Sequence, residues 1–173
     1  FYGNNEDGRQ WIHTVEWDYR TTIDVDPSTY AYQNIVLDFE GLDTYADVYL
    51  NEEKVLTSNN MFRAWKVDVK PLLKPGKNSL RILFHSAVEV ALPLAAALPY
   101  QLPAPNDPDD QKISVFVRKA AYHFGWDWGP RFVTVGIWRP AYLTAWNDAR
   151  LTDLHTTTSK LTDKEANLIA HLE

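Results

Sequence analysis

The segment from Tyr122 to Pro130 combines side-chain types that suit the binding of a sugar ring. Within it, Trp126 and Trp128 flank Asp127, and two glycines and a proline bracket these three residues. Glycine adopts backbone conformations that are closed to other residues, and proline stiffens the exit, so the segment predicts a tight, projecting loop. An indole covers the C–H surface of a pyranose, while a carboxylate accepts hydrogen bonds from two adjacent hydroxyls. These residues are therefore a candidate carbohydrate-binding loop.

A purely structural interpretation of the same three residues carries equal weight at this point. Buried aromatic side chains are common in β-sandwiches, so both indoles also fit a hydrophobic core, and the carboxylate fits a turn cap. Arg118 and Lys119, just before the loop, are either an anchor for Asp127 or another acidic group, or a solvated pair at a strand end. The solvated pair is the favoured interpretation. Arg139 has the same two interpretations.

Other chemical motifs are absent from the sequence. The glutamates show no pairing that establishes the two-carboxylate site of a glycosidase. The five histidines lack metal-ligand spacing, there is no cysteine, and the acidic residues from Asp107 to Asp110 lack an EF-hand pattern. No phosphate-binding glycine loop or Gly-x-Ser-x-Gly elbow occurs. We therefore expect no catalytic residue, no metal site and no cofactor within this sequence.

The composition is acidic and rich in aromatic residues. Among 173 residues, 23 are Asp or Glu and 17 are Lys or Arg, and no basic cluster is present, which argues against a nucleic-acid partner. The longest apolar stretch, residues 87–98, is interrupted and shorter than the about 20 residues that cross a bilayer, so we expect a soluble protein without a membrane partner. The first residue is Phe1, so any signal peptide has been removed or lies outside this sequence. Periplasmic, secreted and lysosomal locations all stay open.

Strand signals dominate the chain and helical periodicity is scarce. Ala46, Val48 and Leu50 alternate with more polar residues, which is the period-2 pattern of a half-buried strand. Similar strands are expected at residues 35–39, 45–50, 65–69, 80–84, 113–117, 131–135 and 141–146. Short strands with turns every 8 to 12 residues predict an all-β sandwich or jelly roll. Residues 91–112 contain five of the ten prolines and predict a long irregular loop, of the kind that is functional or disordered.

The composition changes after Trp146. Residues 147–150 predict a linker, and residues 151–158 and 166–172 predict two further strands. Because two strands alone are not stable, these strands indicate the truncated start of a second β domain. We therefore expect one domain over residues 1–146, and a linker with part of another domain over residues 147–173.

Several segments, in unbroken order, resemble the N-terminal domain of the family 2 β-mannosidases. The run from Arg118 to Pro130, with its Gly-Trp-Asp-Trp-Gly-Pro core, carries the most specific part of the resemblance. The others are residues 1–6, 39–44, 46–51, 60–62 and 136–140. The resemblance covers about residues 1–146. It implies a galactose-binding-like jelly roll whose first strands precede Phe1, followed by an immunoglobulin-like sandwich.

The resemblance also implies a place for this chain in a larger enzyme. In such enzymes a (β/α)₈ barrel follows and holds two glutamates, an acid/base and a nucleophile, that act by retaining double displacement. The chain is then the non-catalytic N-terminal portion of an exo-acting β-mannosidase, a hydrolase of terminal β-D-mannose residues, and is inactive alone. Its expected partners are a β-mannoside glycan and the catalytic barrel of the same parent chain.

Carried onto this sequence, the resemblance assigns roles to four residues. Trp126 and Asp127 match the loop that reaches into the −1 subsite of the barrel. Asp127 would accept hydrogen bonds from hydroxyls of the non-reducing mannose, O4 and O6, and Trp126 would shape the wall. Trp128 and Arg118 would support the loop. A loop from a separate domain that closes the pocket beyond the terminal sugar would explain exo-action.

Three other functions compete with this interpretation. The chain could be a free-standing carbohydrate-binding module, or a structural domain that braces a barrel without touching sugar. It could also be the equivalent domain of another family 2 hydrolase, a β-galactosidase or an exo-β-glucosaminidase, which shares the Gly-Ile-Trp-Arg type of signature at residues 136–139. The Gly-Trp-Asp-Trp-Gly-Pro run favours the mannosidase.

Overall fold

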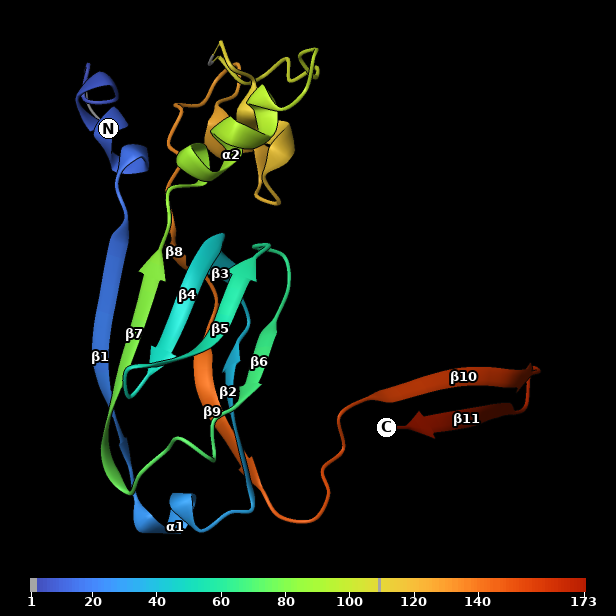
Figure 1. Ribbon diagram of the computed structural model, residues 1–173. Helices are drawn as coiled ribbons and strands as arrows, with labels where there is room; N and C mark the ends of the chain where they lie inside the picture. The colour runs from blue at the N-terminus through green and yellow to red at the C-terminus, as the bar shows by residue number, and fades with distance from the viewer. Residues whose placement is uncertain (1–2, 109) are drawn as a thin grey trace.

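The computed structural model describes residues 3–108 and 110–173, and its main body is a sandwich of two antiparallel sheets (Figure 1). The four-stranded sheet has the order β1 (Trp17–Val25), β7 (Gly76–Phe84), β4 (Tyr45–Leu50) and β5 (Glu53–Asn59). The three-stranded sheet has the order β6 (Trp65–Asp68), β2 (Asn34–Phe39) and β9 (Ala141–Trp146). A short pair, β3 (Leu42–Asp43) and β8 (Gly136–Ile137), joins residues about a hundred positions apart in the sequence.

The core between the sheets follows from the alternation of apolar residues. In β4 the side chains of Ala46, Val48 and Leu50 are buried, and β2 and β7 contribute Phe39 and Phe84. Because successive side chains of a strand point to opposite faces, this period-2 pattern turns one face of each sheet inward. The prediction of an all-β sandwich is confirmed.

A smaller helical layer covers one end of the sandwich. It contains three 3₁₀ helices and one α-helix: η1 (Asp7–Thr14), α2 (Ala87–Ala96), η2 (Ile113–Phe116) and η3 (Ala121–Phe124). A second apolar cluster holds this layer together, and its buried members include Val88, Ile113, Phe124 and Val133. In Figure 1, η1, α2 and the segment that follows η3 lie at this same end. The short helix α1 (Pro27–Tyr30) lies at the opposite end.

Three local predictions are wrong in this helical layer. The predicted loop 91–112 begins inside α2, because Ser86 caps an alanine-rich apolar run by accepting a hydrogen bond from the Glu89 N–H. The predicted strand 113–117 is the helix η2, whose Ser114 N–H is bound by Asp107 Oδ2 rather than by a neighbouring strand. The predicted strand 131–135 is irregular, since side chains rather than a strand bind its backbone groups. Residues 97–112 are irregular as expected over their described positions.

Strand β1 was not predicted. It lies at the edge of its sheet and most of its side chains are exposed, although Trp17, Tyr19, Ile23 and Val25 alternate with polar residues at the period of a strand. Pairing with β7 over nine residues, from Trp17 opposite Phe84 to Val25 opposite Gly76, nevertheless holds it in place. This strand carries η1 and therefore connects the N-terminal helix to the sandwich.

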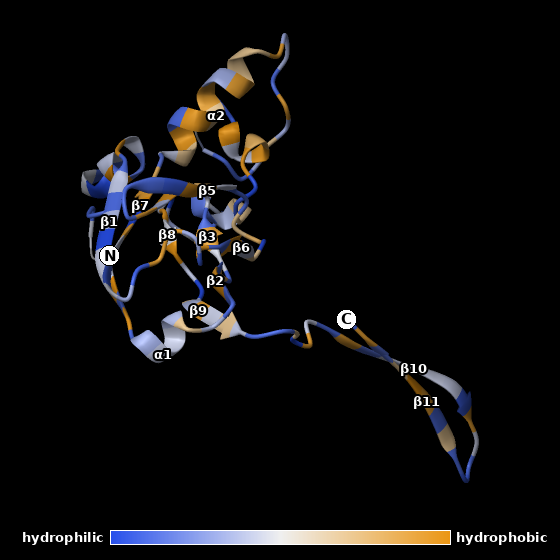
Figure 2. Cartoon of the chain, turned by 60° about the horizontal axis from the view of Figure 1, so that its bottom comes forward, coloured by the Kyte–Doolittle hydropathy of each residue, from blue (hydrophilic) through white to orange (hydrophobic). Residues whose placement is uncertain are grey.

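The last two strands form a hairpin that stands apart from the sandwich. Strands β10 (Leu154–Leu161) and β11 (Ala166–Leu172) pair with each other, and every residue in them is exposed. Figure 2 shows polar and apolar segments along this hairpin, away from the main body. Among the described residues, no helix has the length and apolar character needed to cross a membrane.

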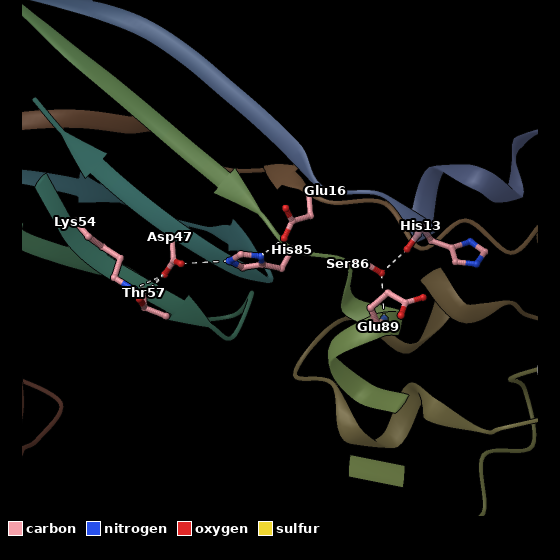
Figure 3. Close-up of polar contacts among 8 residues, drawn as sticks. All are labelled: His13, Glu16, Asp47, Lys54, Thr57, His85, Ser86 and Glu89. Atoms are coloured by element: carbon pink, nitrogen blue, oxygen red, sulfur yellow. Dashed lines mark hydrogen bonds and ion pairs between the residues drawn. The ribbon is translucent and has the colours of Figure 1, made fainter. Parts of the chain in front are cut away.

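Polar contacts fasten the junction between β7 and α2 (Figure 3). His85 lies between two carboxylates, with Nδ1 2.6 Å from Glu16 Oε1 and Nε2 3.3 Å from Asp47 Oδ2. Thr57 donates a 2.6 Å hydrogen bond to the other oxygen of Asp47. The hydroxyl of Ser86 donates to the His13 carbonyl, which ties η1 to the start of α2.

The charge state of His85 predicts a pH-dependent stability. Burial opposes its protonation, but the hydrogen bonds and charges of Glu16 and Asp47 outweigh burial and raise the pKa of His85 above its ordinary 6.5. A raised pKa in the folded state gives stability that is full below pH 6.5 and lost as the pH rises through the folded pKa. We expect the melting temperature to fall as the pH rises above 6.5 and through the folded pKa, and His85→Gln to flatten that slope. His155→Gln, on the exposed hairpin, is the matched control; an unchanged slope in His85→Gln contradicts the assignment.

Candidate functional site

The Trp-Asp-Trp-Gly segment forms a tight turn that projects from the helical layer. The backbone groups of Trp126 and Gly129 bond each other in both directions, with N···O distances of 3.4 and 3.3 Å, so that Asp127 and Trp128 occupy the tip. The prediction of a tight projecting loop is confirmed. Such a turn exposes the two central side chains, because its own backbone bonds close its base.

The exposure of the two indoles excludes their interpretation as core aromatics. Trp128 is 81% exposed and Trp126 is 39% exposed, and their rings meet edge to face at 5.5 Å between centroids. Asp127 is also exposed, and no hydrogen bond joins its carboxylate to another described residue. Two exposed indoles around an uncommitted carboxylate form a surface that is able to bind a polar ring compound.

Two hollows meet at this turn, and Trp126 and Gly129 line both of them. The first, of about 250 Å³, is called the polar hollow below, because four of its lining residues carry polar side chains: Glu6, Asn106, Asp127 and Arg131. The second, of about 630 Å³, is largely apolar and is lined by Trp126 and the following residues: Ala120, Ala121, Tyr122, Trp128, Gly129 and Pro130. The indole of Trp126 is therefore a shared wall between a hydrogen-bonding surface and an aromatic surface.

Gly125 lets the loop at residues 105–108 approach the turn. Its φ of +112° lies in a region that other residues rarely adopt. A Cβ at this position would lie 3.0 Å from Pro108 Cδ and 3.2 Å from the Asn106 carbonyl oxygen. The proline-rich loop is thereby part of the polar hollow.

A buried ion pair fixes the chain just before the segment that carries the turn. The Lys119 ammonium, whose side chain is 0% exposed, contacts Asp43 Oδ2 of β3 and donates a 2.6 Å hydrogen bond to the Thr134 carbonyl. Burial lowers the pKa of Lys119, and the charge of Asp43 opposes this effect. Burial and the charge of Lys119 also lower the pKa of the neighbouring His123. The interpretation of Lys119 as a solvated residue is wrong.

The two arginines that the sequence singled out lie on the surface. Arg118 is exposed, its carbonyl accepts a hydrogen bond from the Met61 N–H, and its guanidinium makes no hydrogen bond to Asp127 or another described residue. The guanidinium of Arg139 lies 4.2 Å from the centre of the Trp138 ring. Trp138 itself is fixed by a 2.9 Å hydrogen bond from its Nε1 to the Met61 carbonyl. A supporting role of Arg118 stays a prediction.

Sequence reasoning missed the residues that fix the turn from a distance. Asp43, Glu6 and Gln10 contact the segment from 76 or more positions away in the sequence, and spacing gives no signal for such contacts. The sequence offered one indication of them: Glu6 and Asp43 lie in segments that carry the family resemblance, and Gln10 follows the first of these segments. Across residues 3–108 and 110–173, no group of three or more His, Cys, Asp or Glu side chains is arranged to hold a metal ion.

Comparisons with known proteins agree with the architecture. The Beta-mannosidase B of Aspergillus terreus is 39% identical over 171 residues, which cover 98% of this chain and 20% of that protein. A β-D-mannosidase crystal structure from Dictyoglomus thermophilum matches with a TM-score of 0.89 and 40% identity, again over 98% of this chain and 20% of the other. An exo-chitosanase from Amycolatopsis orientalis, at 23% identity and a TM-score of 0.60 over 91% of this chain and 16% of the other, shares the fold.

The chain therefore spans about a fifth of the length of the relatives that it matches. Residues 1–139 match the model of one family, whose description is glycosyl hydrolase 2 galactose-binding domain-like. This match covers the helical layer, the Trp-Asp-Trp turn and the strands of the sandwich up to β8, while β9 lies just beyond it, and it confirms the galactose-binding-like fold that the resemblance implied. The chain belongs to the glycosyl hydrolase 2 galactose-binding domain-like family.

Proposed function

We propose that this chain supplies a sugar-contacting turn to the active site of a retaining, exo-acting β-mannosidase. The exposed carboxylate of Asp127, beside the half-exposed indole of Trp126 and at the edge of a polar hollow, carries the proposal. Asp127 accepts hydrogen bonds from hydroxyls of the terminal mannose, Trp126 forms the wall, and Trp128 supports Trp126 through the edge-to-face contact. Arg118 stabilises the loop through its backbone.

The two catalytic glutamates of the proposed enzyme lie elsewhere in the parent chain, in a (β/α)₈ barrel. Two relatives at 39% and 40% identity are β-mannosidases, and this chain covers 20% of each, which supports a larger multidomain parent. On this proposal the present residues alone do not hydrolyse glycosides. The substrate is a β-mannoside glycan, and the partner of the turn is the barrel of the same chain.

We also propose that residues 147–173 begin an immunoglobulin-like domain, after a first domain that ends at residue 146. The hairpin register places Leu154, Leu168 and Leu172 on one face and His155 and His171 on the other. Two strands with one exposed apolar face are not stable alone, and in a β-sandwich such a face packs against a second sheet. The similarity to the β-mannosidases covers 98% of the chain, whereas the galactose-binding-like match ends at residue 139. This extension disfavours a free-standing carbohydrate-binding module.

The substrate class is tested by hydrolysis of aryl β-mannoside, β-galactoside and β-glucosaminide by the full-length protein. We expect the β-mannoside to give the highest kcat/KM, because the turn would bind the hydroxyl arrangement of mannose in the transition state. Preference for the β-galactoside or β-glucosaminide would assign the domain to another family 2 hydrolase. The isolated residues 1–173 serve as the control and should hydrolyse none of the three.

A further inference from the structure

The backbone of Arg131, just after the turn, is held on both sides by side chains from the N-terminal segment. The Glu6 carboxylate oxygen Oε1 accepts a 2.8 Å hydrogen bond from the Arg131 N–H. The Gln10 amide Nε2 donates a 3.0 Å hydrogen bond to the Arg131 carbonyl oxygen. Both the N–H and the carbonyl of Arg131 are thus bonded by side chains more than 120 positions away in the sequence. In a sheet, the backbone of a neighbouring strand would fill these two roles.

The two holding side chains are themselves fixed. Gln10 Nε2 also donates a 3.2 Å hydrogen bond to the Glu6 carbonyl, so the two residues form one unit across the first turn of η1. Although Glu6 occupies the N-cap position of η1, its side chain makes no capping hydrogen bond, and its carboxylate is turned to Arg131 instead. The helix is tied to the sandwich because β1 follows it and Ser86 bonds the His13 carbonyl.

The location of this contact links it to Asp127. Arg131 lies two residues after Gly129, which closes the turn, and only Pro130 with its restricted backbone lies between them. Glu6, Asp127 and Arg131 line the same polar hollow. A shift of the Arg131 backbone is therefore transmitted to the turn through a stiff connection of one residue.

We propose that Glu6 and Gln10 are positioning residues that set the place of Asp127 against the sugar by clamping the backbone of Arg131. This inference rests on the proposed function, since it concerns the same turn. Glu6 does not contact the substrate in this role. Its carboxylate acts as a fixed acceptor for the Arg131 N–H, and a charge-assisted bond of this kind is stronger than a neutral one.

The clamp is tested in the full-length protein with Glu6→Ala, Glu6→Gln and Gln10→Met, each also combined with Asp127→Ala. Misplacement of a binding group by about 1 Å costs up to about 100-fold, so we expect Glu6→Ala to lower kcat/KM on aryl β-mannoside about 10- to 100-fold. Glu6→Gln keeps an acceptor oxygen and should stay within about threefold of the parent. In the Asp127→Ala background, Glu6→Ala should cause little further loss, because the group that it positions is gone.

Amide hydrogen exchange over residues 121–135 gives a readout that does not depend on activity. Glu6→Ala should speed exchange there, and Glu6→Gln should speed it less. If Glu6→Ala does not fold, the same measurement is made on Gln10→Met, which removes the hydrogen bond to the Arg131 carbonyl. Unchanged exchange or unchanged kcat/KM in Glu6→Ala overturns the clamp, as does a full additional loss in the Asp127→Ala background, which would make Glu6 a direct sugar ligand. An Asp127→Ala protein with undiminished activity would instead overturn the proposed function, while the exchange rates still report on the clamp.

Discussion

Asp127→Ala in the full-length protein should lower kcat/KM for aryl β-mannoside about 30- to 1000-fold while leaving the fold unchanged. The carboxylate lies at the tip of a turn that its own backbone bonds close, and it makes no hydrogen bond to another described residue, so its removal breaks no hydrogen bond among the described residues. A charged contact that strengthens as the ring distorts in the transition state contributes about 2 to 4 kcal/mol, which corresponds to this range. Initial rates over a range of substrate concentrations measure the loss.

The design of the controls separates binding from folding. Asp24→Ala removes an exposed carboxylate from β1, far from the turn in the sequence, and should leave both activity and melting temperature unchanged. Asp127→Asn keeps the shape and loses the charge, so it should recover only part of the activity. A loss below about threefold in Asp127→Ala would reduce the turn to a structural element and remove the basis of the subsite proposal.

The strands that were predicted well are those in which period-2 alternation reflects one-sided burial. In β4 the residues Ala46, Val48 and Leu50 face the core and their neighbours do not, and the pattern is legible without any tertiary information. Residues 113–117 contain a similar proportion of apolar residues, yet no described strand pairs with them. Ile113, in η2, and Val117, the extended residue that ends η2, are buried in the second cluster instead. Short apolar runs do not distinguish these two outcomes.

In the candidate site too, features set by adjacent residues could be predicted, whereas contacts from distant segments could not. The sequence predicted the projecting turn because glycine, proline and paired indoles are adjacent in it, and the structure places Trp126 and Trp128 on the surface as that required. The supports of the turn were not predictable, since Asp43 and Glu6 reach it only through the tertiary fold. Lys119 illustrates the difficulty: a lysine beside an arginine is usually solvated, and only the position of β3 makes it a buried partner.

Lys119→Met should destabilise the protein by about 3 to 5 kcal/mol, the largest stability effect that we expect from a single substitution in this chain. Methionine has nearly the volume of lysine, so packing is kept, but the change leaves the buried Asp43 carboxylate without its cation and the Thr134 carbonyl without its donor. The penalty is then that of an uncompensated buried charge rather than of a lost surface contact. Urea unfolding followed by fluorescence measures it.

The second substitution in this test decides whether charge is the cause. If the cost of Lys119→Met comes from the stranded carboxylate, then Asp43→Asn added to it should restore part of the lost stability, because a neutral amide is far less costly to bury. Lys54→Met provides the matched surface control, since Lys54 is exposed and lies 3.5 Å from Asp47, and such pairs contribute about 0 to 1 kcal/mol. A Lys119→Met protein as stable as the parent would mean that Asp43 is compensated without Lys119. Lys119 bonds Asp43 and the Thr134 carbonyl, and the turn that carries Asp127 lies between Lys119 and Thr134 in the sequence. The variant should therefore also loosen this turn, which connects the buried charge to the sugar-binding surface.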